Sequence, residues 1–522
     1  MSDLLLYTIK ERGLLLEKDV FEFLRSFQDE TIARTFLMDF ERVTGQKMIT
    51  TSILHKNLEY VQRIVGQLPG NDRASVENVC VKLGIHLEIH KEQSVVPVPT
   101  SVAVSLPTYR VMLADTGTSK KLDVQDFIGN FRSRYQQLQR ILMQRPDLTS
   151  LVAINKISSN RQNLSLIGML REKRVTKNKN LILSFEDLTG EIQVLVRVDR
   201  EELYTLAREL QLDDVVAIKA SGNREMLFAH EIFFPEAFIA EKMRFQEDVS
   251  IAFISDLHCG SDRHLGQSLS RFLDWLEQGG EAAKTIKYLF ISGDTVDGVG
   301  VFPGQEHVLK LKSMKEQYAL LASYLRRVPK HITMFLCPGQ HDAVRVAEPQ
   351  PIVDLRYAPE LHTIENLVLV TNPTLVKLLE GPKEFKVLMY HGASIHGFIN
   401  EIPALRLMKA HRTPAKAVKY MLQRRHLAPT HSAVVYIPNV NKDPLVIGEV
   451  PDVLCTGEVH RLDVETHHGV LIITGSCWQA QTPFEEKVGN VPDPAKVPVL
   501  NLKTRELKIF DFGVEEEINC EY

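Results

Sequence analysis

The sequence has few cysteines and never places two of them as a Cys-x-x-Cys pair. There are six among 522 residues, at positions 80, 259, 337, 455, 477 and 520. This pattern favours reduced thiols in a cytoplasmic protein over a zinc ribbon or a disulfide framework. Three of them (Cys259, Cys337 and Cys455) lie beside the polar motifs described below. We expect these three to be small buried side chains rather than ligands.

The sequence also lacks a long apolar segment and an excess of positive charge. No apolar run approaches the roughly 20 residues of a membrane span, and the first residues show neither a basic leader nor an apolar signal core. We therefore expect no membrane contact. The net charge of −4 excludes a uniformly basic surface, so any contact with DNA must come from local patches. The length and composition are typical of a soluble protein with about two to four domains.

What the sequence does contain is a series of five short apolar segments, each followed at once by polar residues. The segments are 249–255, 287–292, 332–337, 386–390 and 453–456. The polar residues that follow are Asp256, His258, Asp294, Asp297, Gln340, His341, Asp342, His391, Glu458 and His460. Ligands bind at the carboxyl ends of strands in open sheets. Five such strands in series predict a metal site, whereas one alone would be explained equally well as a polar loop.

The expected chemistry follows from these residue types. A phosphodiester resists hydrolysis because its negative charge repels a nucleophile, and two cations about 3.5–4 Å apart overcome this repulsion and activate a water molecule. One carboxylate has to bridge both ions, and Asp294 fits that role. Mixed nitrogen and oxygen ligands favour manganese, iron or zinc over calcium.

Four regions are expected along the chain. Residues 1–95 show apolar side chains at helical spacing and predict a small helical module, either for interaction or as a structural cap. Residues 96–147 contain a proline-rich linker and an amphipathic helix. Gln125, Ile128 and Phe131 on that helix faintly resemble a sliding-clamp-binding box, although the apolar stripe explains them better. Residues 148–240 predict a β-barrel, and residues 241–522 contain the metal motifs.

The barrel is predicted from the order strand, strand, strand, helix, strand, strand, which is typical of oligonucleotide-binding (OB) barrels. Its first turn carries Lys173 and Arg174, which could contact phosphates or simply be solvated. A second basic stretch, 406–425, lies between the fourth and fifth motif strands. It ends at Arg424 and Arg425, with His426 directly after it. This stretch could steer a DNA strand, or it could be a solvated face or a subunit contact.

The motifs together resemble the calcineurin-type metallophosphoesterases. Two further stretches, SGDTVDGVGVFPGQE at 292–306 and MLQRRHLAP at 421–429, are similar to the small subunits of archaeal D-family DNA polymerases. The resemblance implies an α/β fold: a sandwich of two β-sheets flanked by helices, preceded by an OB-fold barrel and a small helical N-terminal domain. The non-catalytic B subunits of eukaryotic replicative polymerases share this layout but have lost most of the ligands that this chain retains.

The same resemblance implies two metal sites, with Mn²⁺ expected and Mg²⁺, iron or Zn²⁺ as alternatives. Matched residue by residue, one ion is held by Asp256, His258, Asp294 and His460, and the other by Asp294, Gln340, His391 and Glu458. His341 lies over the site as the catalytic acid. Asp342 could orient His341, and Asp297 could support Asp294 or a ligand histidine, with purely structural roles for these two equally open. The chain departs from the usual pattern twice, with Gln340 in place of asparagine and Glu458 in place of histidine. The glutamate adds a negative charge, which leaves activity less certain than metal binding.

The implied function is that of the small subunit of a replicative DNA polymerase, with a 3′–5′ exonuclease that proofreads primer ends. Synthesis belongs to a separate large subunit, and the resemblance also implies action with a sliding clamp. Two alternatives stay open. The chain could be a scaffold subunit whose weakened site does no chemistry, as Glu458 suggests. It could also be a free-standing phosphoesterase, although the barrel and the N-terminal region argue against that.

Overall fold

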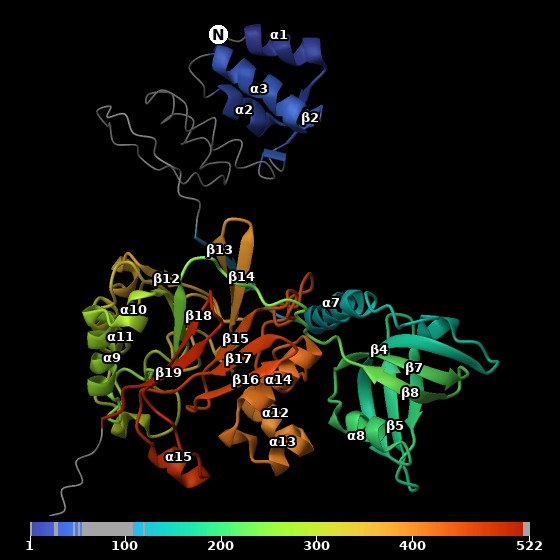
Figure 1. The fold of residues 1–522 in the computed structure, drawn as a ribbon. Coiled ribbons are helices and arrows are strands. Elements are labelled where there is room, and N and C mark those ends of the chain that lie inside the picture. Colours follow the sequence, from blue (N-terminus) through green and yellow to red (C-terminus); the bar gives the residue numbers. More distant parts are fainter. Residues whose placement is uncertain are drawn as a thin grey trace, which may run out of the picture. The chain divides into compact units, whose positions relative to one another are not determined.

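The computed structural model describes residues 3–25, 30–44, 47–50, 53–54, 108–117 and 121–514 (Figure 1). The chain divides into two compact units, 1–104 and 105–522. Most of the predicted proline-rich linker lies outside the described residues, as does the second half of the helical module. Within the described residues, no helix combines the length and apolar character that crossing a membrane requires.

The described part of the first unit is mainly helical, as its apolar spacing predicts. Its elements are α1 (Asp3–Arg12), β1 (Leu15–Leu16), α2 (Lys18–Arg25), α3 (Glu30–Thr44) and β2 (Met48–Ile49). Phe23 of α2 packs edge-on against Phe36 of α3, with ring centroids 5.5 Å apart. Phe36 stacks on Phe40, one helical turn further along. These rings are buried because the apolar residues of each helix recur on one face.

The second unit contains two six-stranded sheets. The first has the order β12-β11-β10-β9-β18-β19, and the second has the order β16-β17-β15-β14-β13-β3. The strands of the first sheet are β9 (Ser250–Ile254), β10 (Ile286–Ser292), β11 (Thr333–Cys337), β12 (Leu367–Leu369), β18 (Lys496–Asn501) and β19 (Leu507–Asp511). Those of the second are β3 (Tyr109–Leu113), β13 (Thr374–Glu380), β14 (Lys383–Met389), β15 (Val453–Thr456), β16 (Asp463–His467) and β17 (Val470–Thr474).

All five predicted motif strands are present, as β9, β10, β11, β14 and β15. β9, β10 and β11 run parallel in the first sheet, and β14 and β15 run parallel in the second. The prediction did not divide them between two sheets. Because both sheets keep their motif strands parallel, the loops after them emerge at matching edges.

The two sheets stack with helices on their outer faces. Phe290, Phe335, Phe385 and Val453 belong to the apolar layer between the sheets. The first sheet is covered by α9 (Gly266–Gln278), α10 (Glu281–Lys284) and α11 (Met314–Leu325), and the second by α12 (Ile395–Glu401), α13 (Pro403–Leu407) and α14 (Ala415–Arg424). A short helix, α15 (Pro483–Val488), precedes β18. The described residues also form the 3₁₀ turns η1 (Ile154–Lys156), η2 (Gln305–His307), η3 (Leu361–Thr363) and η4 (Ala410–Arg412).

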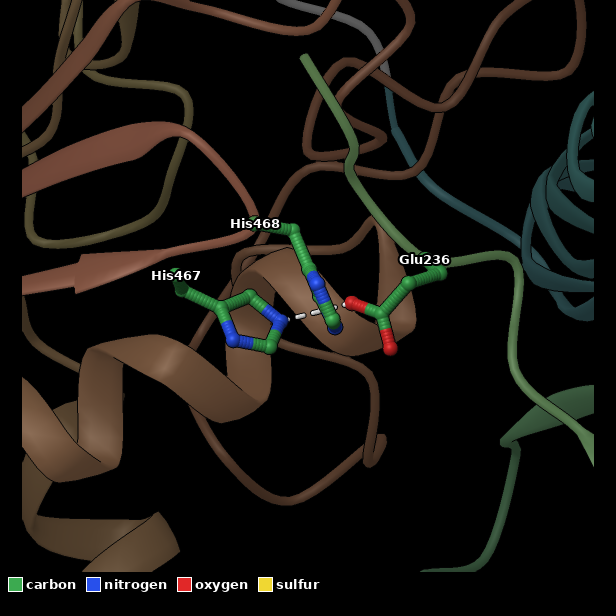
Figure 2. Close-up of side chains that lie close together, drawn as sticks. All are labelled: Glu236, His467 and His468. Carbon is green, nitrogen blue, oxygen red and sulfur yellow. Dashed lines mark hydrogen bonds and ion pairs between the residues drawn. The ribbon is translucent and has the colours of Figure 1, made fainter. Parts of the chain in front are cut away.

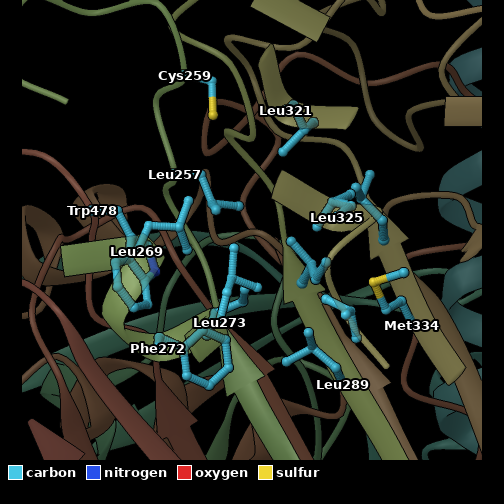
Figure 3. Close-up of a cluster of buried hydrophobic side chains, with 14 of the residues drawn as sticks. Leu257, Cys259, Leu269, Phe272, Leu273, Leu289, Leu321, Leu325, Met334 and Trp478 are labelled. Carbon is cyan, nitrogen blue, oxygen red and sulfur yellow. The ribbon is translucent and has the colours of Figure 1, made fainter. Parts of the chain in front are cut away.

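Figure 3 shows the core beneath α9, where Trp478 and Cys259 lie among leucines. The three motif cysteines are buried free thiols, as predicted.

The barrel has the predicted element order. β4 (Gln162–Val175), β5 (Leu181–Glu186), β6 (Glu191–Val196), α8 (Glu201–Glu209), β7 (Val215–Gly222) and β8 (Leu227–Phe233) form a closed barrel of order β4-β5-β6-β8-β7. The amphipathic helix α7 (Val124–Leu142) begins with a capping box at Asp123 and packs Tyr135, Leu138 and Leu142 against the barrel.

One strand lies where we expected linker. Tyr109–Leu113 forms β3, which pairs antiparallel with β13 at the edge of the second sheet. Its partner lies more than 260 residues away in sequence, and its exposure alternates only weakly along the strand. No local signal therefore marked it.

Candidate metal centre

The seven residues predicted as ligands lie in the loops after β9, β10, β11, β14 and β15. They are Asp256, His258, Asp294, Gln340, His391, Glu458 and His460. Asp256, His258, Asp294 and His391 are each at most 4% exposed. Buried polar groups in a globular domain need polar partners. Several of these side chains lie next to one another, as the distances below show.

Five of the seven have a left-handed backbone. The φ angle is +52° at Asp256, +46° at His258, +46° at Asp294, +73° at Glu458 and +58° at His460. Such conformations cost a non-glycine residue about 1–3 kcal/mol and gather at functional sites, where the surrounding structure enforces them. Their concentration in these loops indicates that the turns hold these side chains in place at the expense of local stability.

The first group of ligand atoms comes from Asp256, His258 and His460. Nδ1 of His258 lies 3.1 Å from Asp297 Oδ1, and Nδ1 of His460 lies 3.1 Å from Glu485 Oε1. A carboxylate only accepts, so each Nδ1 carries a hydrogen and each neutral ring presents a lone pair at Nε2. The two Nε2 atoms lie only 3.0 Å apart. They need either a proton or a cation between them.

The second group comes from Asp256, Asp294 and His391. Nδ1 of His391 donates to the Ser292 carbonyl at 2.9 Å, which leaves Nε2 as the ligand atom. That Nε2 lies 3.2 Å from Asp294 Oδ2 and 3.2 Å from Glu458 Oε2. Asp294 also accepts from the His341 backbone N–H at 2.9 Å, directly after Gln340. Asp294 therefore contacts His391 and the loop after β11, while Asp256 is the residue that the two groups share, so the bridging role of Asp294 stays a prediction.

Two buried acceptor atoms of the predicted ligands, Asp256 Oδ2 and Gln340 Oε1, have no hydrogen-bond partner, and His391 Nε2 makes no aligned hydrogen bond although it faces two carboxylates. A buried acceptor left without a partner costs about 1–3 kcal/mol. All three can donate a lone pair to a cation. The residues present therefore fit divalent metal ions, and Gln340 offers the same amide oxygen as the usual asparagine.

The electrostatics agree with this fit. Burial opposes a charged imidazole, but Glu485 and Asp256 raise the pKa of His460 to about 9. Burial likewise opposes ionisation of Asp294, yet His391 and His341 lower its pKa. The carboxylates thus stabilise positive charge in the cluster. When no metal ion is bound, that positive charge is a proton on a histidine. Metal ions would supply the same charge and displace the protons.

Glycines keep the cluster close to the backbone. A Cβ on Gly293, whose φ is +82°, would lie 2.2 Å from His391 Nδ1. One on Gly339 would lie 2.2 Å from Asp294 Oδ1, and one on Gly457 would lie 2.5 Å from Asp256 Oδ2. These positions tolerate no side chain, because each would displace a predicted ligand.

Comparisons with known proteins indicate the family. Residues 251–464 match the family model that describes the B subunits of DNA polymerases alpha and epsilon. The DNA polymerase II small subunits of Methanothermobacter thermautotrophicus and Archaeoglobus fulgidus are 35% and 36% identical to this chain, over 74% and 76% of its length, and the chain covers 80% of each. This chain belongs to the family of DNA polymerase II small subunits.

The small subunit of Pyrococcus furiosus is 37% identical over 409 residues, which are 76% of this chain but 65% of that relative. The chain therefore spans less than two thirds of this DNA polymerase II small subunit. Among solved structures, an archaeal phosphodiesterase is matched over 50% of this chain and 99% of its own, at 11% identity and a TM-score of 0.25. A likeness this weak carries no argument.

His341 lies at the rim of the cluster. Its Nδ1 is 2.6 Å from the Asp297 carbonyl, and its Nε2 is 3.8 Å from Asp294 Oδ2. The side chain is 22% exposed, more than His258 or His391. Burial lowers the pKa of His341, but Asp294, Asp297 and Glu458 together outweigh burial and raise it. His341 can therefore hold a proton between the cluster and solvent.

Of the two roles left open for Asp342, its hydrogen bonds match the structural one. Its carboxylate does not contact His341; it accepts from the Thr295 and Gly339 backbone N–H groups at 3.2 and 2.9 Å and from Tyr318 Oη at 3.0 Å. Asp342 faces away because His341 turns toward Asp297. It ties the loop after β10 to the loop after β11 instead of orienting the catalytic acid.

Three residues that we expected to contact DNA are buried, so that expectation is wrong. Arg424 pairs with Asp214 of the barrel at 3.0 Å, and Arg425 donates to the Ile447 carbonyl at 2.7 Å. His426 lies fully inside. Its Nδ1 accepts from a backbone N–H, and its Nε2 faces Asp443 at 3.1 Å. None of the three can reach a phosphate while these contacts hold.

The basic turn of the barrel gives a mixed result. Lys173 Nζ donates to the carbonyls of Arg208 and Leu210 at 3.0 and 2.6 Å, so it caps the end of α8. Arg174 is exposed, and its contact with DNA stays a prediction.

Two residues near the cluster were missed. Glu485 is buried on α15 and supports His460. Thr482 and Glu485 form a capping box, a local signal that marks the start of a helix but not its contact with a ligand. His396, on α12, has its Nε2 3.6 Å from Glu458 Oε1. No sequence signal indicated that contact.

Proposed function

We propose that this chain is the small subunit of an archaeal D-family DNA polymerase, and that its two-sheet domain is a calcineurin-type metallophosphoesterase acting as a 3′–5′ exonuclease. The observation that supports the chemistry best is that Asp256 Oδ2 and Gln340 Oε1 are buried acceptors without hydrogen-bond partners, close to His391. The family membership supports the polymerase context, because the relatives are named small subunits of DNA polymerase II.

Two divalent metal ions fit the donor atoms. Asp256, His258, Asp294 and His460 would hold one, and Asp294, Gln340, His391 and Glu458 would hold the other. When bound, such ions neutralise phosphate charge and lower the pKa of a water molecule. We expect Mn²⁺, with Mg²⁺, iron or Zn²⁺ as alternatives, because the donors mix imidazole nitrogen with carboxylate and amide oxygen.

His341 would act as the general acid. The Asp297 carbonyl fixes its Nδ1–H, so the ring presents Nε2 toward Asp294 at 3.8 Å. The carboxylate field favours a proton on this nitrogen, which can then be donated to the leaving oxygen of the cleaved ester. Its partial exposure lets it meet a DNA end that approaches from solvent.

The supporting carboxylates fix the ligand histidines. Asp297 and Glu485 each accept from a Nδ1–H, which sets the tautomer and holds Nε2 toward the cluster. Glu458 adds a negative charge where the wider superfamily has histidine. That charge favours a hard cation and weakens the Lewis acidity felt by the substrate.

DNA synthesis would belong to a large subunit that forms a heterodimer with this chain. DNA would reach the cluster as a single strand or frayed primer end, and a sliding clamp would act through the complex. Because Arg424 and Arg425 are buried, DNA would contact other surfaces of the chain, including Arg174.

A mismatched primer–template with a 5′ label on the primer tests the proposal. We would compare wild-type chain, His341→Ala and the control His307→Ala, each with and without co-expressed large subunit, in Mn²⁺. His307 is a surface histidine whose side chain is 81% exposed. We expect stepwise shortening of the primer by wild type and control, and a loss of about 10²-fold or more in His341→Ala.

The outcomes separate the proposals. Equal shortening by wild type and His341→Ala would refute the role of His341. A stable complex that cleaves nothing at any Mn²⁺ concentration would refute the exonuclease and favour a scaffold subunit.

A further inference from the structure

A second group of metal-ligating side chains lies away from the candidate metal centre, where the barrel joins the two-sheet domain. Figure 2 shows Glu236, His467 and His468 with their side chains drawn together. Glu236 belongs to the segment that leaves β8 of the barrel. His467 is the last residue of β16, and His468 begins the turn to β17.

The distances suit one small cation. Nε2 of His467 lies 2.7 Å from Glu236 Oε1. One ligand atom from each of the three residues lies within 4.8 Å of the other two. Ligands bound about 2.1 Å from a zinc ion are separated by about 3.4 Å, so only small side-chain shifts would be needed. His467 is buried and His468 is exposed, so the group has one side open to water.

The backbone holds two of the three residues in costly conformations. The φ angle is +49° at Glu236 and +44° at His468. The Glu236 N–H donates to the Gln423 carbonyl at 3.0 Å, and the Ile239 N–H donates to the His468 carbonyl at 2.9 Å. A left-handed backbone also marks five of the seven predicted ligands of the main cluster. Asparagine is the usual residue before glycine in such a two-residue turn, yet here the position carries an imidazole.

A simple hydrogen bond explains only part of this arrangement. It accounts for His467 and Glu236, but it gives the imidazole of His468 no role beside that carboxylate. A metal ion gives all three residues a role. Two imidazoles and one carboxylate are a common zinc ligand set, with water in the fourth position.

We propose that Glu236, His467 and His468 bind one divalent transition-metal ion of the Zn²⁺ class. His467 would bind as the neutral imidazole with its proton on Nδ1, so that Nε2 donates its lone pair to the ion in place of the hydrogen bond to Glu236. The ion would connect the segment after the barrel to the β16–β17 turn and brace the joint between the two domains. This site is independent of the proposed exonuclease.

Titration of the full chain with Co²⁺, a visible stand-in for Zn²⁺, tests the proposal. We would count bound ions by equilibrium dialysis and follow d–d absorption for wild type, His468→Ala, Glu236→Gln and the control His307→Ala. His307 faces a single carboxylate, that of Glu306, at 3.6 Å. Glu236→Gln keeps an acceptor for His467 but removes the anionic ligand. The same comparison in a His391→Ala background separates this site from the main cluster.

We expect wild type and His307→Ala to bind one more ion than His468→Ala in both backgrounds. Glu236→Gln should bind that ion at least about tenfold more weakly. In the His391→Ala background, Zn²⁺ should raise the melting temperature by less when His468 is also replaced, because only the remaining ion of the main cluster then binds. Unchanged melting without metal would show that His468→Ala and Glu236→Gln are folded. The proposal is overturned if these folded variants bind as many ions as wild type with the same affinity.

Discussion

Replacing Glu485 with glutamine should weaken metal binding without removing a ligand. Glu485 Oε1 accepts from His460 Nδ1 at 3.1 Å, and Oε2 accepts from the Thr482 N–H at 2.9 Å. Glutamine has one acceptor oxygen, so it satisfies one of these partners and turns an N–H toward the other. Helix α15 should still form, because glutamine also completes a capping box. The loss therefore falls on the orientation and basicity of His460.

Loss of such a supporting carboxylate typically weakens metal affinity by about 10–100-fold, which is about 1.4–2.7 kcal/mol of binding free energy. Calorimetric titration with Mn²⁺ measures it directly. Glu486→Gln is the matched control, because Glu486 is the next residue of the same helix and is exposed. At saturating Mn²⁺ the cleavage rate of Glu485→Gln should recover most of the wild-type value. If both variants bind Mn²⁺ like wild type, the reasoning about His460 is refuted.

Three further changes probe other parts of the molecule. Burial lowers the pKa of His426 to about 4, below the unfolded value of about 6.5. The free energy of unfolding should therefore be highest above pH 6.5 and fall by about 3 kcal/mol as the pH drops toward 4. Thermal melting at several pH values should show this decrease for wild type but not for His426→Gln. Asp214→Asn leaves Arg424 buried without its anion and should lower the free energy of unfolding, measured in urea, by about 3–5 kcal/mol. A decrease of less than about 1 kcal/mol would contradict the buried ion pair. Gly293→Ala places a methyl group against His391. The number of Mn²⁺ ions bound should therefore fall from two to one. Binding of two ions at wild-type affinity would argue against the second site.

Much of the candidate site could be predicted because its signals are local. A buried parallel strand is a short apolar run, and the residue that follows it lies at the sheet edge wherever the strand sits in the sheet. Asp256, Asp294 and Glu458 were therefore placed correctly at strand ends without knowledge of the strand order. The barrel was predictable for the same reason, since its strands and its helix follow one another directly in sequence.

The rest depended on contacts between distant segments. A basic helix end looks solvated in sequence, and only the carboxylate of Asp214, about 210 residues earlier, shows why Arg424 is buried. The same holds for Asp342, whose sequence neighbour is His341 but whose hydrogen bonds go to Thr295 and Tyr318. Composition and spacing describe a residue's neighbours along the chain, whereas its charge is paired by neighbours in space.

The burial of Arg424 has a consequence for dividing this chain. Its Nε donates to both carboxylate oxygens of Asp214, at 3.0 and 3.1 Å, from the two-sheet domain to the barrel. A fragment that begins at residue 241 would keep the guanidinium and delete its anion. The barrel and the two-sheet domain should therefore unfold in one cooperative transition, and the shortest fragment that folds must include both.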